Sequence, residues 1–294
     1  MEPYAALEML GKEAQKHGDR LAAISVDHLV DVKRDFDDSG IDDISQYYRF
    51  EPRDDLGFAA QSILVVASPS PLASVVFNKD GEKKTVTIPP TYVGMEKQEA
   101  AIEQYLQSAL HEYGFAVTRA GQLPCKPIAV HAGLGLFGRN SLVYVDGMGS
   151  FVRLSLFFSD MPCQHELFYP LRRHDACQNC NRCVDNCPAG GLTHQRDYVN
   201  YDRCLTTMNE RAEDFPDWVK PEWHHALIGC MKCQCVCPLN KPYMECSDEI
   251  VCYSAEETLS LINGELPDAL LAPLGMEYCH QILPRNVAAL LRQV

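Results

Sequence analysis

Residues 177–188 read CQNCNRCVDNCP, so Cys177, Cys180, Cys183 and Cys187 follow the spacing C-x2-C-x2-C-x3-C and are followed by Pro188. Three thiolates this close in sequence can surround one corner of an iron–sulfur cubane, while the fourth, held by the turn before the proline, faces a second cluster. Zinc sites usually consist instead of separated cysteine pairs. The run therefore predicts [4Fe–4S] clusters.

A second run of this kind is incomplete. Cys230, Cys233 and Cys237 have the spacing C-x2-C-x3-C, and again a proline follows. Two cubanes need eight thiolates, the two runs supply seven, and the isolated Cys204 lies between them. In two-cluster ferredoxins the last cysteine of such a run serves the other cluster. We therefore predict two ligand sets: Cys177, Cys180, Cys183 and Cys237 for one cluster, and Cys187, Cys204, Cys230 and Cys233 for the other. Cys235 is the main competitor for a place in the second set.

The other cysteines do not indicate disulfides. The chain has 294 residues and 14 cysteines, of which none precedes Cys125. A chain of this length can be stable without disulfides, and a reducing compartment does not favour them. The cysteines without spaced partners are expected to be small buried hydrophobic residues: Cys125, Cys163, Cys246, Cys252 and Cys279.

Charge and hydropathy suggest where the protein works. The net charge is -14 and the pI is about 5.1, whereas nucleic-acid-binding proteins usually carry a basic patch, so a nucleic-acid partner is unlikely on this ground. The longest apolar runs, such as residues 62–68, are far shorter than the roughly 20 residues of a membrane-spanning helix. The acidic, amphipathic N-terminus does not resemble a signal peptide. We expect a cytoplasmic protein without a membrane partner.

The cysteine-free first half has the pattern of mixed α/β structure. Residues 96–113 carry apolar side chains at helical spacing, and Gly114 follows where a C-terminal cap belongs. Residues 74–88 contain Asp80-Gly81 and predict a hairpin. Other helices are expected at residues 3–17 and 126–132, and strands at 21–26, 62–67, 115–118, 141–145 and 150–158.

A glycine-rich turn, Gly133 to Asn140 (GLGLFGRN), precedes the cysteines. Its spacing is G-x-G-x-x-G, but a dinucleotide site requires a strand before it and a helix after it, and here the order is reversed. Three glycines in six residues still indicate close approach of the backbone to another group. That group is either another part of the protein, in a tightly packed turn, or a flat ligand.

The cysteine distribution predicts three parts. We expect an α/β ligand-binding domain at residues 1–165, a bacterial-ferredoxin-like module with two [4Fe–4S] clusters at 166–245, and a short helical tail at 246–294. The fold class is thus α/β or α+β. Two adjacent clusters also indicate electron relay, because structural support alone would be met by one.

Several longer stretches together resemble a known family. They are HAGLGLFGRNSLVYVDGMGSFVRLSLFFSDMPC, the two cysteine runs with YDRC between them, SILVVASPSP in the first third, and more weakly LPRNVAALL in the tail. This combination is similar to the epoxyqueuosine reductases and their relatives, the reductive dehalogenases. The resemblance implies a nitroreductase-like α/β domain that binds cobalamin without a protein ligand to cobalt and receives electrons through two clusters. The D-x-H-x-x-G motif of His-ligated cobalamin proteins is absent around His131, in agreement with this.

The resemblance also implies which residues lie near the corrinoid. A flat ring would lie on the turn formed by Gly133, Gly135 and Gly138, with Arg139, Asn140 and Arg153 as polar contacts to the corrinoid or the substrate. The chain departs from the epoxyqueuosine reductases in one important respect. Their catalytic Asp lies about a dozen residues before the A-G-L-G stretch, and without gaps that position is Arg119 here.

The sequence therefore predicts a cytoplasmic, cobalamin-dependent iron–sulfur oxidoreductase. A low-potential donor such as ferredoxin or flavodoxin would supply electrons, and the corrinoid would cleave a carbon–oxygen or carbon–halogen bond of a small-molecule substrate. Three alternatives remain open. The chain could bind or reduce a corrinoid for a partner enzyme, it could reduce epoxyqueuosine in tRNA, or it could be an electron carrier only.

Overall fold

The computed structural model describes residues 3–39, 44–163, 168–194, 198–244 and 246–292. The chain forms two compact units, the first from Met1–Pro69 and Gln98–Cys180, the second from Ser70–Lys97 and Asn181–Val294. This division differs from the sequence-based boundaries at 165 and 245, because residues 70–97 fold with the second half of the chain. The three-part scheme stays a prediction.

The first unit is built on an antiparallel sheet in the order β1 (Arg20–Ser25), β2 (Ser62–Pro69), β8 (Val152–Ser159) and β5 (Val117–Arg119). β2 is buried from Ser62 to Ser68 because it lies in the interior of the sheet. Such a continuous apolar run is typical of a strand covered on both faces. A two-stranded ribbon is formed by β6 (Leu136–Phe137), which lies within the glycine-rich turn, and β7 (Val143–Tyr144), which follows it.

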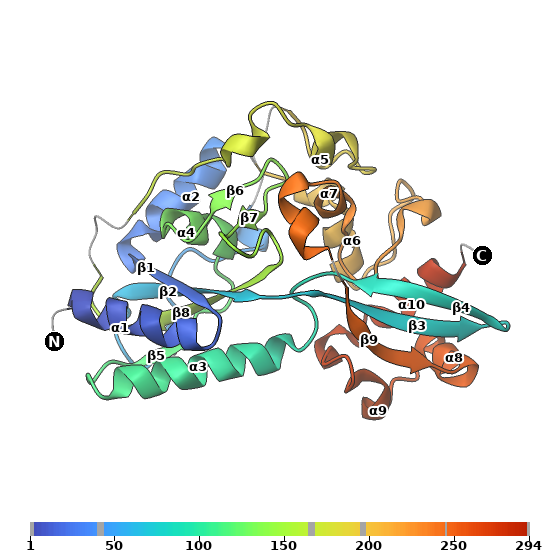
Figure 1. Cartoon of the computed structure of the whole chain (residues 1–294), viewed down its shortest axis with the longest axis horizontal. Helices are drawn as coiled ribbons and strands as arrows, with labels where there is room; N and C mark the ends of the chain where they lie inside the picture. The colour runs from blue at the N-terminus through green and yellow to red at the C-terminus, as the bar shows by residue number, and fades with distance from the viewer. Residues whose placement is uncertain (1–2, 40–43, 164–167, 195–197, 245, 293–294) are drawn as a thin grey trace. The chain divides into compact units, whose positions relative to one another are not determined.

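Four helices cover this sheet (Figure 1). α1 (Pro3–Lys16) and α3 (Met95–His111) share one core with it, in which Leu10, Leu64 and Leu106 are fully buried. α4 (Cys125–His131) packs against the sheet as well, and Figure 1 shows it beside α2 (Leu29–Asp38) on the opposite side. The helix predicted at 96–113 is confirmed, with its apolar stripe turned to the core.

The second unit has a three-stranded sheet, β4 (Glu82–Ile88), β3 (Leu72–Lys79) and β9 (Cys246–Tyr253). β3 and β4 form the predicted hairpin, and its turn residues Asp80 and Gly81 have φ of 52° and 85°, as a tight hairpin turn requires. β9 pairs with β3 in parallel. The sequence predicted a short helical tail and missed this strand, since its partner lies far away in the chain.

The rest of the second unit consists of short helices and loops. The cysteine-bearing region contains α5 (Arg182–Asp185), α6 (Leu205–Glu210) and α7 (Lys232–Cys235). The tail contains α8 (Ala255–Asn263), α9 (Asp268–Leu271) and α10 (Leu283–Leu291). The tail and the β3–β4 hairpin share one hydrophobic core, in which Phe77, Tyr253 and Val287 are almost fully buried. Within the described ranges, no helix has the length and hydropathy needed to cross a membrane.

The mixed α/β fold class is confirmed, although the main sheet is antiparallel. α/β proteins with βαβ connections have parallel sheets instead. The chain therefore corresponds to the α+β form of the prediction.

His224 in the second unit provides a test of this packing by pH. The ring is 5% exposed and lies 4.4 Å from the Phe215 ring. Burial, followed by the charge of Arg285, lowers the pKa of His224 to about 4. As the pH falls below about 6.5, the unfolded chain takes up a proton at this residue and the folded chain does not.

We therefore expect proton uptake at His224 in the unfolded chain to lower the unfolding free energy by about 1.4 kcal/mol for each unit that the pH falls between about pH 6 and 5. Urea unfolding at a series of pH values measures this slope. His224→Gln should reduce this slope by the equivalent of one proton. His280→Gln, a change at an exposed position, should not reduce it. Equal slopes in the parent and His224→Gln would contradict the burial of a neutral ring.

Candidate functional site

Four of the predicted cluster ligands lie together in the second unit. Cys187 follows α5, Cys204 immediately precedes α6, Cys233 lies in α7, and Cys230 lies in the loop before α7. Asn186, next to Cys187, donates a 2.6 Å hydrogen bond from Nδ2 to the carbonyl of Lys232, next to Cys233. This bond ties the two cysteine runs to each other.

The pKa shifts of these thiols also indicate that they lie close to one another. Burial, with smaller contributions from the nearby Cys204 and Cys187, raises the pKa of the Cys230 thiol to about 12, although a backbone hydrogen bond and the charge of Lys232 act to lower it. Burial also raises the pKa of Cys233 well above its ordinary value, and Cys230, Cys204, Cys183 and Cys187 add to this effect. Thiols in such a place stay protonated unless a metal displaces the proton. Buried sulfur ligands of this kind fit an iron–sulfur cluster.

Cys235 differs from these residues. It is exposed, and partial burial of its sulfur raises its pKa while the charge of the nearby Lys232 acts to lower it. The assignment of Cys204 to the second set, with Cys235 as the competitor, stays a prediction.

The other predicted set is divided between the two units. Cys177 and Cys180 belong to the first unit, and Cys183 and Cys237 to the second. Cys177 is 8% exposed and Cys183 is 9% exposed. In the described part of the chain, no three His, Cys, Asp or Glu side chains come together as ligands of one metal ion. A cubane does not need such a group, because each of its four thiolates binds a different iron atom.

Arg139 holds the loop that carries Cys177 and Cys180. Its NH2 group donates to the carbonyl of Cys177 at 2.8 Å and to that of Gln178 at 3.4 Å, and its Nε donates to the carbonyl of Cys180 at 3.0 Å. The sequence predicted Arg139 as a contact to the corrinoid or substrate. In the structure its guanidinium instead fixes three backbone groups of the first cysteine run.

The three glycines of the turn make room for the protein's own side chains. A Cβ atom on Gly133 would lie 2.8 Å from the Tyr169 ring, and one on Gly135 would lie 2.6 Å from the carbonyl oxygen of Tyr144. A Cβ atom on Gly138 would overlap the Tyr144 ring. These contacts correspond to the packed turn, one of the two alternatives drawn from the sequence.

The remaining predicted corrinoid contacts also have partners within the chain. Asn140 is 5% exposed and donates from Nδ2 to the hydroxyl of Tyr144 at 3.1 Å. Arg153 forms an ion pair with Glu99 of α3. For all six predicted residues, a role in binding a corrinoid stays a prediction without support from their contacts.

His131 is not placed to bind a metal. Its Nδ1 donates to the carbonyl of Tyr169, its Nε2 lies 2.6 Å from a carboxylate oxygen of Asp35, and its ring stacks on Phe168 at 4.0 Å. Both ring nitrogens are therefore engaged by oxygen atoms of the protein.

The position at which the family's catalytic Asp was expected holds a charge network. Arg119 lies at the end of β5 and pairs with Glu103 at 3.3 Å and with Glu99 at 3.6 Å, and Glu99 also pairs with Arg153 of β8. Glu99 and Glu103 are one helical turn apart on α3, and this spacing can be read from the sequence. Their partners come from strands that are distant in the chain, so sequence reasoning missed the network.

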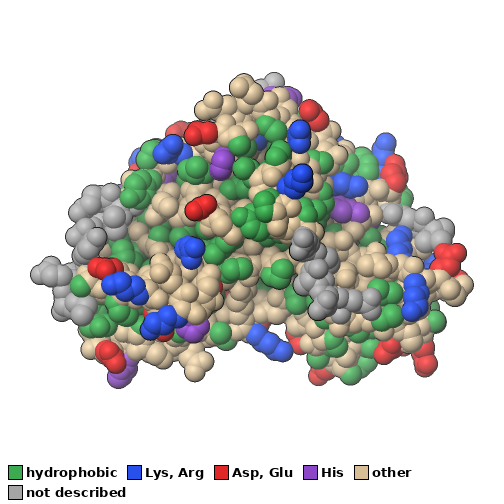
Figure 2. Space-filling model, viewed as in Figure 1, with side chains coloured by type: hydrophobic (Ala, Val, Ile, Leu, Met, Phe, Trp, Pro, Cys, Tyr) green, Lys and Arg blue, Asp and Glu red, His purple; other side chains and the backbone are tan. Residues whose placement is uncertain are grey.

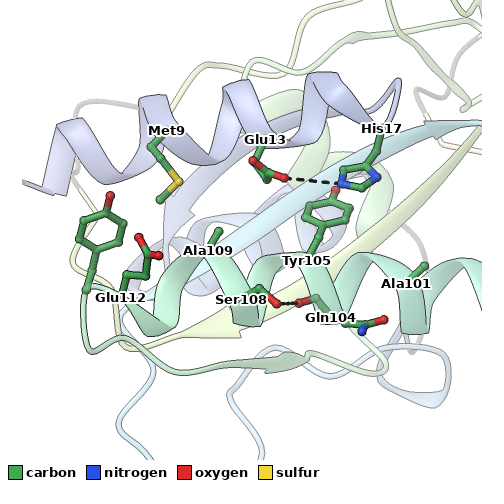
Figure 3. Close-up of a pocket in the computed structure, with 10 residues that line it drawn as sticks. Met9, Glu13, His17, Ala101, Gln104, Tyr105, Ser108, Ala109 and Glu112 are labelled. Carbon is green, nitrogen blue, oxygen red and sulfur yellow. Dashed lines mark hydrogen bonds and ion pairs between the residues drawn. The ribbon is translucent and has the colours of Figure 1, made fainter.

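A groove of about 650 Å³ lies elsewhere in the first unit, between α1 and α3. Figure 3 shows Glu13 of α1 above the floor formed by Ala109 and Ser108 of α3, with His17 stacked on Tyr105 at one end. Its lining contains none of the predicted ligands and no cysteine. We assign it no part in the chemistry.

The chain was compared with known proteins. Residues 176–240 match a family described as a 4Fe-4S double cluster binding domain, and this segment contains all eight predicted ligands. The chain is 30% identical to the epoxyqueuosine reductase of Bacillus subtilis (strain 168) over 155 residues, which are 50% of this chain and 39% of that protein. In four such relatives the aligned part spans 39% to 53% of their length.

Solved structures show the same fold. The structure of epoxyqueuosine reductase from Streptococcus thermophilus has a TM-score of 0.69 at 20% identity, covering 96% of this chain and 80% of that chain. A crystal structure of epoxyqueuosine reductase with a tRNA stem loop has a TM-score of 0.65 at 20% identity, covering 99% of this chain and 82% of that chain. The resemblance drawn from the sequence is confirmed. The expectation that a nucleic-acid partner is unlikely is not borne out, because a relative binds tRNA.

The first prediction from the site concerns Arg139. Removing the guanidinium in Arg139→Gln releases three carbonyls of the Cys177–Cys180 loop, so one cluster should be lost. We expect iron to fall from about eight to about four atoms per chain after anaerobic purification. Arg172→Gln, a change at an exposed arginine, is the control and should keep the full iron content. Full iron in Arg139→Gln would show that the loop does not need the guanidinium.

The second prediction from the site concerns the charge network on α3. Glu99→Gln removes the charge that pairs with Arg119 and Arg153, and Glu99 is only 17% exposed. Hydrogen bonds to charged groups contribute about 1.5–3 kcal/mol each, so we expect the unfolding free energy to fall by roughly 2 kcal/mol. Urea unfolding measures it, with the exposed Glu112→Gln as the control. An unchanged midpoint for Glu99→Gln would mean that the network adds nothing to stability.

Proposed function

We propose that this chain, a relative of the epoxyqueuosine reductases, is an iron–sulfur reductase that relays electrons through two [4Fe–4S] clusters to an acceptor bound by its first unit. The observation that carries the proposal is the gathering of Cys187, Cys204, Cys230 and Cys233 within a segment that matches a double cluster domain. When bound, such clusters accept and release electrons one at a time.

The chain's own residues would hold and shield these clusters. The Asn186 side chain fixes the two cysteine runs relative to each other, and Arg139 fixes the loop of Cys177 and Cys180. Partial burial of Cys233 would limit the access of water to the sulfur atoms. Hydrogen bonds and solvent access set the potential of a cluster, so these residues would tune electron transfer as well as hold the ligands.

The proposed acceptor is a corrinoid, and its support is the relationship to the epoxyqueuosine reductases. The six residues predicted to contact it have partners within the chain, so they give no independent support. We therefore derive no step through this group. A ferredoxin or flavodoxin is proposed as the donor, and the protein is proposed to act in the cytoplasm.

The substrate is proposed to differ from epoxyqueuosine. Reductive opening of an epoxide needs a proton donor, and the expected position holds Arg119, paired with two glutamates. On the face shown in Figure 2, the Lys and Arg side chains of the described residues are scattered rather than gathered into a patch for phosphates. A small molecule with a reducible carbon–oxygen or carbon–halogen bond fits these observations.

Epoxyqueuosine reduction in tRNA is the second candidate. The names of the relatives favour it, and one of them was solved with a tRNA stem loop. Expression in a queuosine-deficient strain separates the two candidates. We expect no restoration of queuosine, and restoration would establish the tRNA reaction instead.

Anaerobic purification with metal analysis tests the proposal itself. We expect about eight irons per chain, and about one cobalt per chain when cobalamin is supplied during expression. Zinc in place of iron would overturn the cluster assignment. Eight irons with no cobalt would overturn the corrinoid acceptor and leave an electron carrier.

A further inference from the structure

We propose that Asn286 of the tail helix α10 is a positioning residue for the second cluster, the one assigned to Cys187, Cys204, Cys230 and Cys233. This inference rests on the proposed function and extends it to the C-terminal tail. The tail contributes none of the predicted ligands, but its first turn is bonded to both segments that carry Cys204 and Cys230.

The amide of Asn286 is 1% exposed and fully engaged. Its Nδ2 donates to two backbone carbonyls, that of Asn209 at 3.0 Å and that of Leu227 at 3.1 Å. Its Oδ1 accepts from the guanidinium of Arg285 at 3.0 Å. Because both carbonyls can only accept, the orientation of the amide is determined by its partners.

These two carbonyls belong to different ligand segments. Asn209 lies in α6, which begins directly after Cys204, and Leu227 lies three residues before Cys230. Asn286 therefore joins the helix after one proposed ligand to the loop before another.

Asn209 makes the same connection a second time. Its side chain is also 1% exposed, and its Nδ2 donates to the carbonyl of Gly229 at 2.6 Å. Gly229 is the residue immediately before Cys230. The two asparagines thus fix the loop through both Leu227 and Gly229.

The neighbouring tail residue and a segment of the hairpin region complete the arrangement. Arg285 donates to the carbonyl of Met208 in α6 at 3.0 Å. Tyr92 donates from its hydroxyl to Glu210 at the end of α6, and Gly229, with φ of 64°, has no room for a Cβ atom because the Tyr92 ring lies against it. The Cys230 loop is therefore held between α6, α10 and Tyr92.

These contacts form a frame around the Cys230 loop. The frame would determine how far Cys204 and Cys230 are separated and how much water reaches them. The potential of a [4Fe–4S] cluster depends on hydrogen bonds and solvent exposure around its sulfurs. The reduced cluster carries one more negative charge than the oxidised one, so water stabilises it preferentially. Loosening the frame should then raise the potential of the second cluster only.

The experiment compares the two clusters within one protein. Asn286→Leu removes the amide at nearly constant volume, and Asn286→Asp keeps its shape but removes both donated hydrogen bonds. Asn263→Leu, a change of an exposed asparagine in α8, is the control. Iron is counted for each full-length protein, and the midpoint potentials of both clusters are measured by redox titration followed by electron paramagnetic resonance. The Cys204→Ser variant identifies the signal of the second cluster.

We expect each Asn286 variant to raise the midpoint of the second cluster by at least a tenfold change in its reduction equilibrium, which is 59 mV for one electron. The first cluster and the control should stay unchanged. Loss of four irons with loss of the second signal alone would also support the proposal. Equal shifts of both clusters, loss of both, or no shift of either would overturn it. A parent protein without eight irons would refute the proposed function instead.

Discussion

The second unit depends on burying sulfur ligands that must carry charge when they bind iron. Burial holds the pKa of Cys230 near 12 and that of Cys233 well above its ordinary value, so these thiols would be neutral without metal. With four thiolates, an oxidised cubane carries a net charge of about -2. The loops that present the ligands are fixed mainly by side-chain amides on backbone carbonyls. Asn186, Asn209 and Asn286 all act in this way.

In the first unit, a cationic side chain rather than an amide fixes the loop that carries predicted ligands. Arg139 lies near the end of the glycine-rich turn and binds three carbonyls of the first cysteine run. The turn itself is closed by Tyr169 and Tyr144, which occupy the space that side chains at Gly133 and Gly138 would need. Arg139, near the end of the A-G-L-G-x-x-G-R-N stretch that carries much of the family resemblance, thus fixes the loop of Cys177 and Cys180.

Local features could be predicted from the sequence. The cysteine spacing indicated the double cluster domain, the apolar period indicated α3, and Asp80-Gly81 indicated the hairpin, because each depends on neighbours in the chain. Pairing over long distances could not be predicted. The parallel strand β9, the pairs of Arg119 with Glu99 and Glu103, and the bonds of Asn286 all join segments that no local pattern connects.

The central claim is that Cys204 completes the second cluster, and matched cysteine substitutions test it most directly. Cys204→Ser and Cys235→Ser are purified anaerobically, and iron content and Mössbauer spectra are recorded for both. We predict that Cys204→Ser loses four irons or shows one altered cluster, while Cys235→Ser keeps eight irons and the parent spectrum. Loss of a cluster in Cys235→Ser, with Cys204→Ser unchanged, would contradict the account.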